Sequence, residues 1–200
     1  MEKMLAPVGL IWKIESIVEA VKLDEVFQTA QPLEVELGAG DGSFLVKYAA
    51  LHPDHNFIGV ERLLGRLRKT EKKGLRAKLM NLRLARMEAS YFLEFLLPKK
   101  SIAALHVYFP DPWPKRKHRK NRLVNERFTQ LAGEVLKSGG AIFLRTDDED
   151  YFAQMIQVFK ANLNFEEFQT PAALSEVVTD FERNFNLQGV PTLRAAYRLK

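Results

Sequence analysis

The stretch Leu33–Phe44, LEVELGAGDGSF, joins an apolar strand to a glycine-rich turn and the start of a helix. Gly38, Gly40 and Gly42 allow the chain to turn tightly and bring bare backbone close to a ligand at a helix start. The dinucleotide fingerprint GxGxxG would need glycine or alanine at position 43, which is serine here. A dinucleotide is therefore the least favoured ligand, and the stretch indicates a nucleoside site of another kind.

Strand-like and helix-like segments alternate around this stretch. The strand-like segments are Leu33–Leu37, Phe57–Val60, Leu82–Arg86, Ala103–Phe109, Ala141–Thr146, Phe165–Gln169 and Leu193–Leu199. The helical patterns are Ser43–Leu51, Leu63–Lys73, Ser90–Leu97, Leu123–Lys137, Asp150–Ala161 and an amphipathic one at Ile11–Phe27. The alternation predicts an α/β fold with a doubly wound, mostly parallel seven-stranded sheet, helices on both faces and an antiparallel last strand. We expect one domain over residues 1–200, with an N-terminal helical lead-in at 1–31 and the core at 32–200.

The composition excludes several classes of protein. Of the 200 residues, 46% are hydrophobic and 28% charged, which is a globular balance, and none is cysteine. Without cysteine there is no disulfide framework or thiolate metal site, and we expect a cytoplasmic protein. The longest uncharged runs have ten residues, too few to cross a membrane. The four histidines include only one close pair, so we expect no metal.

Positive charge is concentrated in two blocks. Arg62–Arg86 holds ten Lys/Arg against one acid, and Lys115–Arg122 holds six against none. Subtracting these from totals of 30 and 25 leaves 14 basic and 24 acidic residues elsewhere. Two basic blocks on an otherwise acidic chain favour a surface that binds a polyanion. For the first block, a solvated helix face remains the alternative.

Three acids, Glu36, Glu61 and Glu88, stand at or near the ends of the first three strands, where parallel sheets bind ligands. A carboxylate at Glu61 can accept hydrogen bonds from ribose hydroxyls, although pairing with Arg62 is an alternative. Glu88 could instead cap the helix that begins near Ser90. Together the acids predict a pocket that repels a pyrophosphate and suits a cationic nucleoside such as S-adenosylmethionine.

The fourth strand stops abruptly at FPDPWPK, Phe109–Lys115. The three alternate prolines lack amide hydrogens and have restricted φ, so the chain must leave the sheet as a stiff extended loop. This places Asp111 near the centre of the sheet, where cofactor and substrate should meet. Trp113 could be a stacking wall or a core plug, and the cations that follow suit a substrate with phosphates.

Five motifs resemble, in order and spacing, those of the tRNA (guanine-N7-)-methyltransferase family. They are ELGAGDG, GVER, FPDPWPKRKHRKNRL, RTDDEDY and TDFERNFNLQGVP, and the resemblance covers Leu33 to Lys200. It implies a class I, Rossmann-like methyltransferase fold, S-adenosylmethionine as cofactor and methylation of a guanine at N7 in the variable loop of tRNA. It also implies that tRNA is the partner. We expect no membrane association, and we expect a monomer or a homodimer.

The resemblance implies roles for particular residues. The cofactor site would comprise Glu36, Gly38, Gly40, Gly42, Glu61, Arg62, Glu88 and Asp111, with Asp111 also the catalytic carboxylate. The substrate would contact Lys115, Asp147, Thr179, Asp180, Phe181 and Glu182. The RNA backbone would meet Arg116, Lys117, Arg119, Lys120 and Arg122. This chain departs from the family in having Glu88 where Asp or Asn is more usual, and a short segment before Leu33.

Several alternatives stay open. Thr146-x-x-Glu149 and Thr179-x-x-Glu182 both fit capping boxes. We favour the cap for Thr146, with Asp147 free for substrate, and the substrate role for the second motif. Asp-Pro-Trp loosely resembles the loop of exocyclic-amine methyltransferases, but the second adjacent proline of that loop is missing. A non-catalytic RNA-binding module with a dead pocket is a further reading, which cofactor binding would distinguish.

Overall fold

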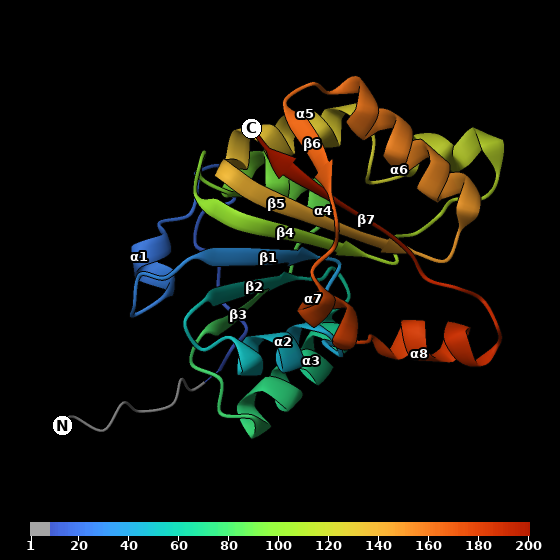
Figure 1. The fold of residues 1–200 in the computed structure, drawn as a ribbon. Coiled ribbons are helices and arrows are strands. Elements are labelled where there is room, and N and C mark those ends of the chain that lie inside the picture. Colours follow the sequence, from blue (N-terminus) through green and yellow to red (C-terminus); the bar gives the residue numbers. More distant parts are fainter. Residues whose placement is uncertain (1–8) are drawn as a thin grey trace.

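A seven-stranded sheet forms the centre of the computed structural model, which describes residues 9–200 (Figure 1). The strand order is β3-β2-β1-β4-β5-β7-β6; β1 to β5 run parallel, and β7 is antiparallel to both β5 and β6. The strands are β1 (Leu33–Leu37), β2 (Asn56–Val60), β3 (Leu82–Ala85), β4 (Ile102–Tyr108), β5 (Leu136–Thr146), β6 (Phe165–Phe168) and β7 (Leu193–Leu199). The predicted fold class is confirmed.

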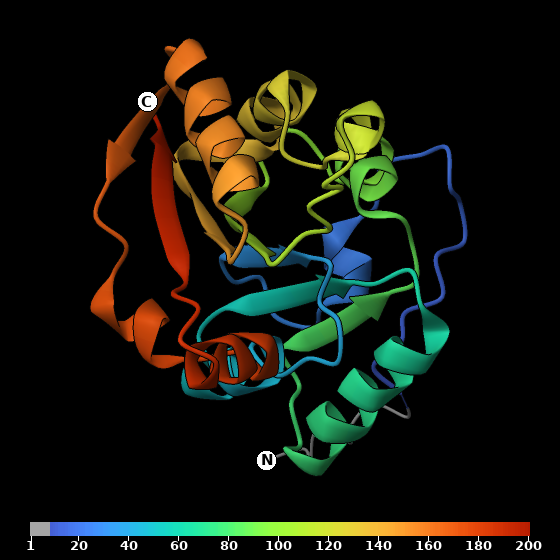
Figure 2. The same ribbon diagram turned by 90° about the vertical axis from the view of Figure 1, so that its right-hand side faces the viewer.

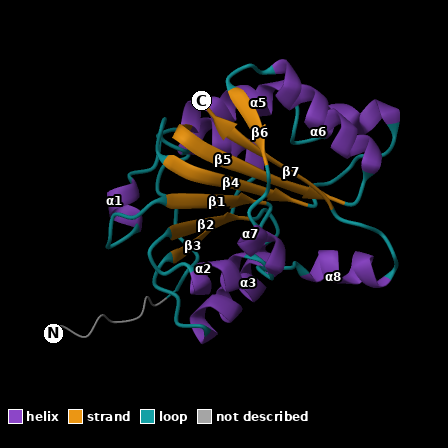
Figure 3. Cartoon of the chain, in the orientation of Figure 1, coloured by secondary structure: helices purple, strands orange, loops and turns teal. Residues whose placement is uncertain are grey.

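Helices cover both faces of the sheet (Figure 3). α2 (Leu45–Leu51) and α3 (Leu64–Arg76) lie on one face, and α4 (Ala89–Tyr91), α5 (Glu126–Val135) and α6 (Glu149–Ala161) on the other. The remaining helical elements are α1 (Leu23–Val26), a π turn η1 (Phe92–Leu96), a 3-10 turn η2 (Arg116–Asn121), α7 (Ala172–Glu176) and α8 (Asp180–Leu187). Within residues 9–200, no helix combines the length and apolar character that crossing a membrane requires.

The central strand β1 is buried along its whole length, so its alternate residues enter two separate cores. Leu33, Val35 and Leu37 join the core under α5 and α6. Glu34 and Glu36 face the opposite side. Burial opposes ionisation of Glu34, but hydrogen bonds of 2.6 Å with His106 and with His55 hold the pKa of Glu34 below its usual value. Among the described residues, no donor forms a hydrogen bond with Oε2 of Glu36.

The amphipathic helix expected at Ile11–Phe27 is wrong, because only Leu23–Val26 is helical there. Ile11 instead bridges to Leu84 at the edge of β3, where Trp12 N–H donates to the Leu84 carbonyl at 2.8 Å. An edge strand offers unpaired amides and carbonyls, and β-branched side chains suit extended backbone. Residues 1–8 of the expected lead-in lie outside the described part of the chain.

Two other boundaries differ from expectation. β5 begins at Leu136 instead of Ala141, and its pairing with β4 shifts register near Ala104. The capping box expected at Thr146 is also wrong. A cap at Thr146 would need a helix that begins at Asp147, whereas α6 begins at Glu149 and its N-cap is Asp148. The Asp148 side chain accepts the Tyr151 amide at 2.7 Å. A short Asp side chain caps well, so it displaces Thr146 from that role.

Candidate active site

Two adjoining cavities lie beyond the carboxyl ends of the parallel strands, the edge that faces the viewer in Figure 2. The acidic compartment, of about 440 Å³, is lined by Glu61, Arg62 and Glu88 among others. The α8 compartment, of about 320 Å³, is lined by Glu36, Gly40, Asp147, Thr179 and Phe181 among others. Their shared residues are Gly38, Arg66, Tyr108, Phe109, Pro110 and Asp111. Asp111 therefore stands in the common wall, as its place after β4 predicted.

The glycine turn adopts backbone angles that other residues rarely take. Gly38, Gly40 and Gly42 have φ of 88°, 57° and 73°. A Cβ on Gly42 would lie 2.4 Å from Cγ2 of Thr70 on α3, so only glycine fits between the turn and that helix. The tight turn expected from the sequence is present and is packed directly against α3.

Glu61 closes the turn onto the end of β2. It is 7% exposed, and its carboxylate accepts the Gly40 amide at 3.1 Å and the Leu63 amide at 2.7 Å. No ion pair joins it to Arg62 within residues 9–200, so the surface-pair alternative is not what the structure shows. A carboxylate has about four lone-pair sites, so two remain for a ligand in the acidic compartment.

Glu88 combines both roles considered for it. Its carboxylate accepts the Tyr91 amide at 2.9 Å as the N-cap of α4 and also borders the acidic compartment. Burial opposes its ionisation, but the hydrogen bonds from Ser90 and Tyr91, with help from Arg62, hold the pKa of Glu88 below its usual value. It is therefore a fixed negative charge at the rim.

Glu36 is the exceptional acid of the site. It is 3% exposed, and no donor among the described residues satisfies its buried Oε2. Burial raises the pKa of Glu36 to about 8, an effect that Asp41 and Glu61 reinforce and Arg145 opposes. An unsatisfied buried carboxylate beside a cavity fits a ligand cation such as an ammonium group, because that cation would supply the missing donors.

The loop that carries Asp111 is strained and tightly held. Phe109 and Trp113, on either side of it, have φ of 49° and 45°, which is costly for aromatic residues. Two hydrogen bonds hold this shape. The Phe109 amide donates to the Arg145 carbonyl at 2.8 Å, and Arg122 Nε donates to the Pro112 carbonyl at 2.7 Å. Asp111 itself stays exposed between them.

Trp113 is a wall and not a core plug. Its side chain is 38% exposed, it borders the acidic compartment and its ring stacks on His118 with centroids 5.9 Å apart. A flat aromatic face at that position can stack on a base or support a ligand.

The structure contradicts the prediction that Arg122 contacts the RNA backbone. Its side chain is buried, with the guanidinium bonded to Asp150 at 2.6 Å, to Gln154 at 2.9 Å and to the Pro112 carbonyl. It also lies over the Tyr151 ring at 4.7 Å. Arg122 thus anchors the Asp111 loop to α6 and has no free donor face to offer a phosphate.

The remaining cations of this block are exposed on η2 and its flanks. Lys115, Arg116, Lys117 and Lys120 make no ion pair with any residue in 9–200, whereas Arg119 pairs with Asp150 at 3.0 Å. Lys115 borders neither compartment. Four cations on this surface are therefore available to a phosphate, and Arg119 is partly occupied.

The substrate residues predicted near the C-terminus divide into two groups. Asp147, Thr179 and Phe181 border the α8 compartment. Thr179 also forms a capping box with Glu182, whose fully buried carboxylate pairs with Arg145 at 3.0 Å and with Arg194. The Asp180 amide donates to Ser43 Oγ at 3.1 Å. Glu182 and Asp180 therefore position the first group and do not line the cavity.

Sequence reasoning missed several residues of the cavity walls, among them Arg66, Tyr108 and Phe185. Arg66 and Tyr108 border both compartments, and Phe185 borders the α8 compartment, where its ring stacks on Phe109. Tyr108 is the last residue of β4, so its place at the strand end could have identified it. Arg66 lies in the first turn of α3, four residues after Arg62, and its place in the same basic block was the available signal for it.

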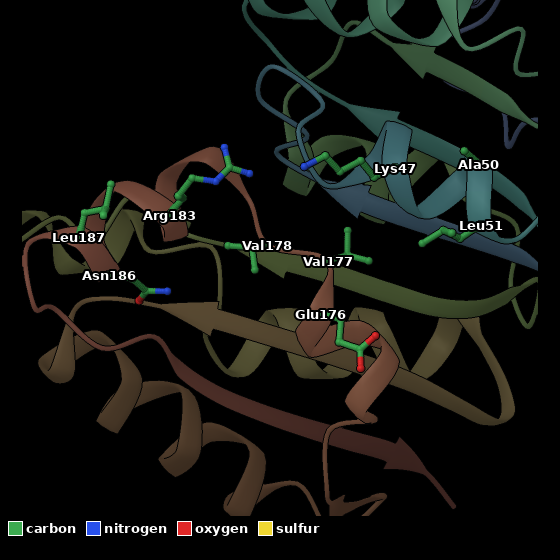
Figure 4. Close-up of a pocket in the computed structure, with 9 residues that line it drawn as sticks. All are labelled: Lys47, Ala50, Leu51, Glu176, Val177, Val178, Arg183, Asn186 and Leu187. Atoms are coloured by element: carbon green, nitrogen blue, oxygen red, sulfur yellow. The ribbon is translucent and has the colours of Figure 1, made fainter.

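A larger groove lies apart from these compartments, between α2, α7 and α8 (Figure 4). It measures about 770 Å³ and its lining, which includes Leu51, Val177 and Leu187, is mainly apolar. It contains none of the predicted site residues, so its size does not make it the reaction site. Among the described residues, no group of three or more His, Cys, Asp or Glu is placed to hold a metal ion.

Comparison with known proteins identifies the family. A family model described as a putative methyltransferase matches residues 30–195. The chain is 39% identical over 68% of its length to a tRNA (guanine-N(7)-)-methyltransferase of Syntrophotalea carbinolica, and 34% identical over 90% of its length to that of Halorhodospira halophila. The chain belongs to this family. It spans 59% of the first relative and 80% of the second.

The family membership agrees with the fold. The solved 16S rRNA methyltransferase KamB superposes with a TM-score of 0.64 at 12% identity, covering 89% of this chain and 92% of that one. Since the identity is low, this likeness shows the fold alone, and it confirms the expected class I methyltransferase fold.

Replacing Glu36 tests whether burial raises the pKa of its carboxyl group. A carboxyl whose pKa rises from 4.5 to about 8 on folding holds a proton in the native state that the unfolded chain releases. The free energy of unfolding then falls as pH rises between these values. Glu36→Gln removes that fall, so the variant should exceed the wild type by about 3–4 kcal/mol at pH 8 and by less than about 1 kcal/mol near pH 5. Urea unfolding at both pH values measures this.

The same variant should bind S-adenosylmethionine more weakly than the wild type, since the amide cannot neutralise an ammonium group. Parallel stability curves for the two proteins between pH 5 and 8 would show that Glu36 ionises normally. A gain in stability with unchanged cofactor affinity would remove Glu36 from the binding site.

Two arginines that share one acid provide a matched test of the Asp111 anchor. Arg122→Ala leaves Asp150 and the Pro112 carbonyl without their buried partner and should cost about 2–4 kcal/mol of stability. Arg119→Ala removes only an exposed ion pair with the same Asp150 and should cost less than about 1 kcal/mol. Thermal unfolding of both variants checks this, and equal losses would contradict an anchoring role for Arg122.

Proposed function

We propose that this protein transfers a methyl group from S-adenosylmethionine to N7 of a guanine in the variable loop of tRNA. The observation that carries the proposal is the position of Asp111 in the wall shared by two compartments. A side chain there can contact a cofactor on one side and a base on the other. The exposed cations on η2 support a substrate with phosphates, and the similar proteins named above support the specific reaction.

The acids of the site fit the cofactor group by group. Glu61 has lone pairs left for a ribose diol, and Glu88 offers a fixed charge at the rim of the acidic compartment. Glu36 would receive the ammonium group, which supplies the donors that its Oε2 lacks. When bound, S-adenosylmethionine supplies a sulfonium methyl group whose transfer to the N7 lone pair leaves the bond electrons on sulfur and removes no proton from guanine.

The protein's own contribution is therefore positioning and charge. Since N7 needs no base to expose its lone pair, the residues must align the guanine and exclude water. The product ring gains positive charge, so the Asp111 carboxylate would hydrogen-bond the base and favour charge developing on it. The backbone is strained at Phe109 and Trp113, and the hydrogen bonds of Arg122 and Arg145 hold it in that shape. The loop thereby keeps the Asp111 carboxylate in one place. We propose that the protein does this work in the cytoplasm, which a tRNA substrate supports.

The direct test is incubation of purified protein with isotopically labelled S-adenosylmethionine and unmodified tRNA, followed by nucleoside analysis. The expected product is 7-methylguanosine at a single guanine of the variable loop. Label in an exocyclic amine would favour the alternative methyltransferase reading. Cofactor binding without any transfer to tRNA would favour a protein that binds RNA and has lost the reaction.

Two variants separate chemistry from RNA affinity. Asp111→Ala should lower the single-turnover methylation rate at saturating tRNA on the order of 10²-fold, with affinity for tRNA largely kept, because the carboxylate acts on the transition state. The combined variant Arg116→Ala, Lys117→Ala and Lys120→Ala should keep that rate. Its slope of log affinity against log salt should flatten by about 2, because each lost phosphate contact removes about 0.7–0.9.

Filter binding across a salt series and rapid-quench methylation provide the two measurements. Arg119 is left unchanged in the combined variant because Asp150 already holds it. A normal methylation rate in Asp111→Ala at saturating tRNA would show that the proline-rich loop serves only to position the cations.

A further inference from the structure

The surface of α3 carries positive charge that the protein does not neutralise. Arg62–Lys78 contains eight Lys/Arg and one acid, Glu71. Glu71 is occupied by the amides of Leu10 and Ile11 at 3.0 and 3.1 Å. Within residues 9–200, Lys73 alone of the eight forms an ion pair, with Asp41 at 2.8 Å. The other seven cations face solvent without an acidic neighbour in contact.

Four of the eight form one row, which we name the α3 stripe: Arg62, Arg66, Lys69 and Lys73. Arg66, Lys69 and Lys73 are spaced by three and four residues, so they lie one turn apart on the same side of the helix, and Arg62 stands two residues before the first helical residue, Leu64. The buried residues of α3 are Leu67, Thr70 and Gly74, which fix the helix against the core. From Arg66 to Lys73 the row is about 10 Å long. Arg66, Lys69 and Lys73 are thus held on a rigid element.

The α3 stripe borders the reaction site. Arg62 and Arg66 line the acidic compartment, and Arg66 also lines the α8 compartment. Farther along, Lys73 reaches Asp41 in the glycine turn. Around the helix, Arg68 and Lys72 lie about 160° and about 120° from Arg66, and they border neither compartment. The helix therefore has two basic surfaces, only one of which adjoins the site.

The opening of the site has cations on its other side as well. Asn121, the last residue of η2, and Trp113, three residues before its start, also line the acidic compartment. In Figure 2, α3 lies on one side of the strand ends and the yellow-green turn of residues 116–121 on the other. The pocket between them is rimmed by acids that suit a cation, so these outer cations serve a different, anionic ligand.

We propose that the α3 stripe binds the RNA backbone of the substrate, so that tRNA is held on two basic surfaces on opposite sides of the site. The inference rests on the proposed function for its choice of RNA. Rows of like charges one turn apart repel each other in the free protein, and phosphates bound along the row remove that repulsion. Arg66, which borders both compartments, contacts a phosphate next to the guanine that is methylated and so positions that nucleotide.

A pair of double variants on one helix tests the proposal. Arg66→Ala with Lys69→Ala removes two cations of the α3 stripe, and Arg68→Ala with Lys72→Ala removes two from the other surface. Both variants lose the same net charge. The first should bind unmodified tRNA at least about tenfold more weakly at low salt, with its salt slope flattened by about 1.4–1.8, while the second keeps the wild-type slope. Filter binding from 50 to 200 mM salt, without cofactor, measures this.

Each other outcome overturns the proposal. Equal losses in the two double variants would show diffuse attraction to a basic protein. A normal salt slope in the first variant, with weaker S-adenosylmethionine binding by calorimetry, would assign Arg66 to the cofactor. Melting temperatures of both variants confirm folding, since all four side chains are exposed.

The experiment also separates this proposal from the proposed function. If the wild-type protein methylates no tRNA, the proposed function fails, yet the two salt slopes still show whether the α3 stripe binds RNA. If methylation occurs and the slopes of the two variants agree, the function stands and the α3 stripe has no special role.

Discussion

The buried ion pair between Arg145 on β5 and Glu182 on α8 is the interaction on which the site depends. Both side chains are at most 1% exposed, and their atoms lie 3.0 Å apart. Removing two charges from water costs several kcal/mol each, so such a pair is stable only when further partners satisfy both groups. Arg145 also donates to the carbonyls of Val177 and Leu174, and Arg194 bonds the second oxygen of Glu182.

This network explains how a C-terminal segment reaches a site built on the N-terminal strands. Val177 and Leu174 belong to the segment that carries α7, and Glu182 lies in the first turn of α8, so one guanidinium fixes both helices. The guanidinium lies 4.3 Å from the ring of Tyr108, which itself borders both compartments. Moreover, the Arg145 carbonyl receives the Phe109 amide, so the same residue sets the start of the Asp111 loop.

The elements with local signals could be predicted from the sequence, and those fixed by distant partners could not. The apolar strands and the glycine turn are specified by their own residues, which is why the sheet and the positions of Glu36, Glu61 and Asp111 agree with expectation. Ile11–Phe27 has a helical pattern, but the open edge of β3 competes for its backbone. Arg122 reads as one cation of a basic block, and only its contacts with Asp150 and Gln154, 28 and 32 residues away, show that it is buried.

In the proposed reaction the site would hold a cation beside a polyanion, and the structure fixes each acid of the site at a different depth. At the rim, hydrogen bonds from Ser90 and Tyr91 and the nearby Arg62 keep the pKa of Glu88 below its usual value, so that acid stays ionised. Deeper in, burial raises the pKa of Glu36 to about 8 despite Arg145. Glu36 is thus the acid whose charge state would respond to a bound cation, because a cation against it restores its usual ionisation. A bound cation would then favour the charged form of the deep acid, whereas the basic rim is charged with or without a ligand.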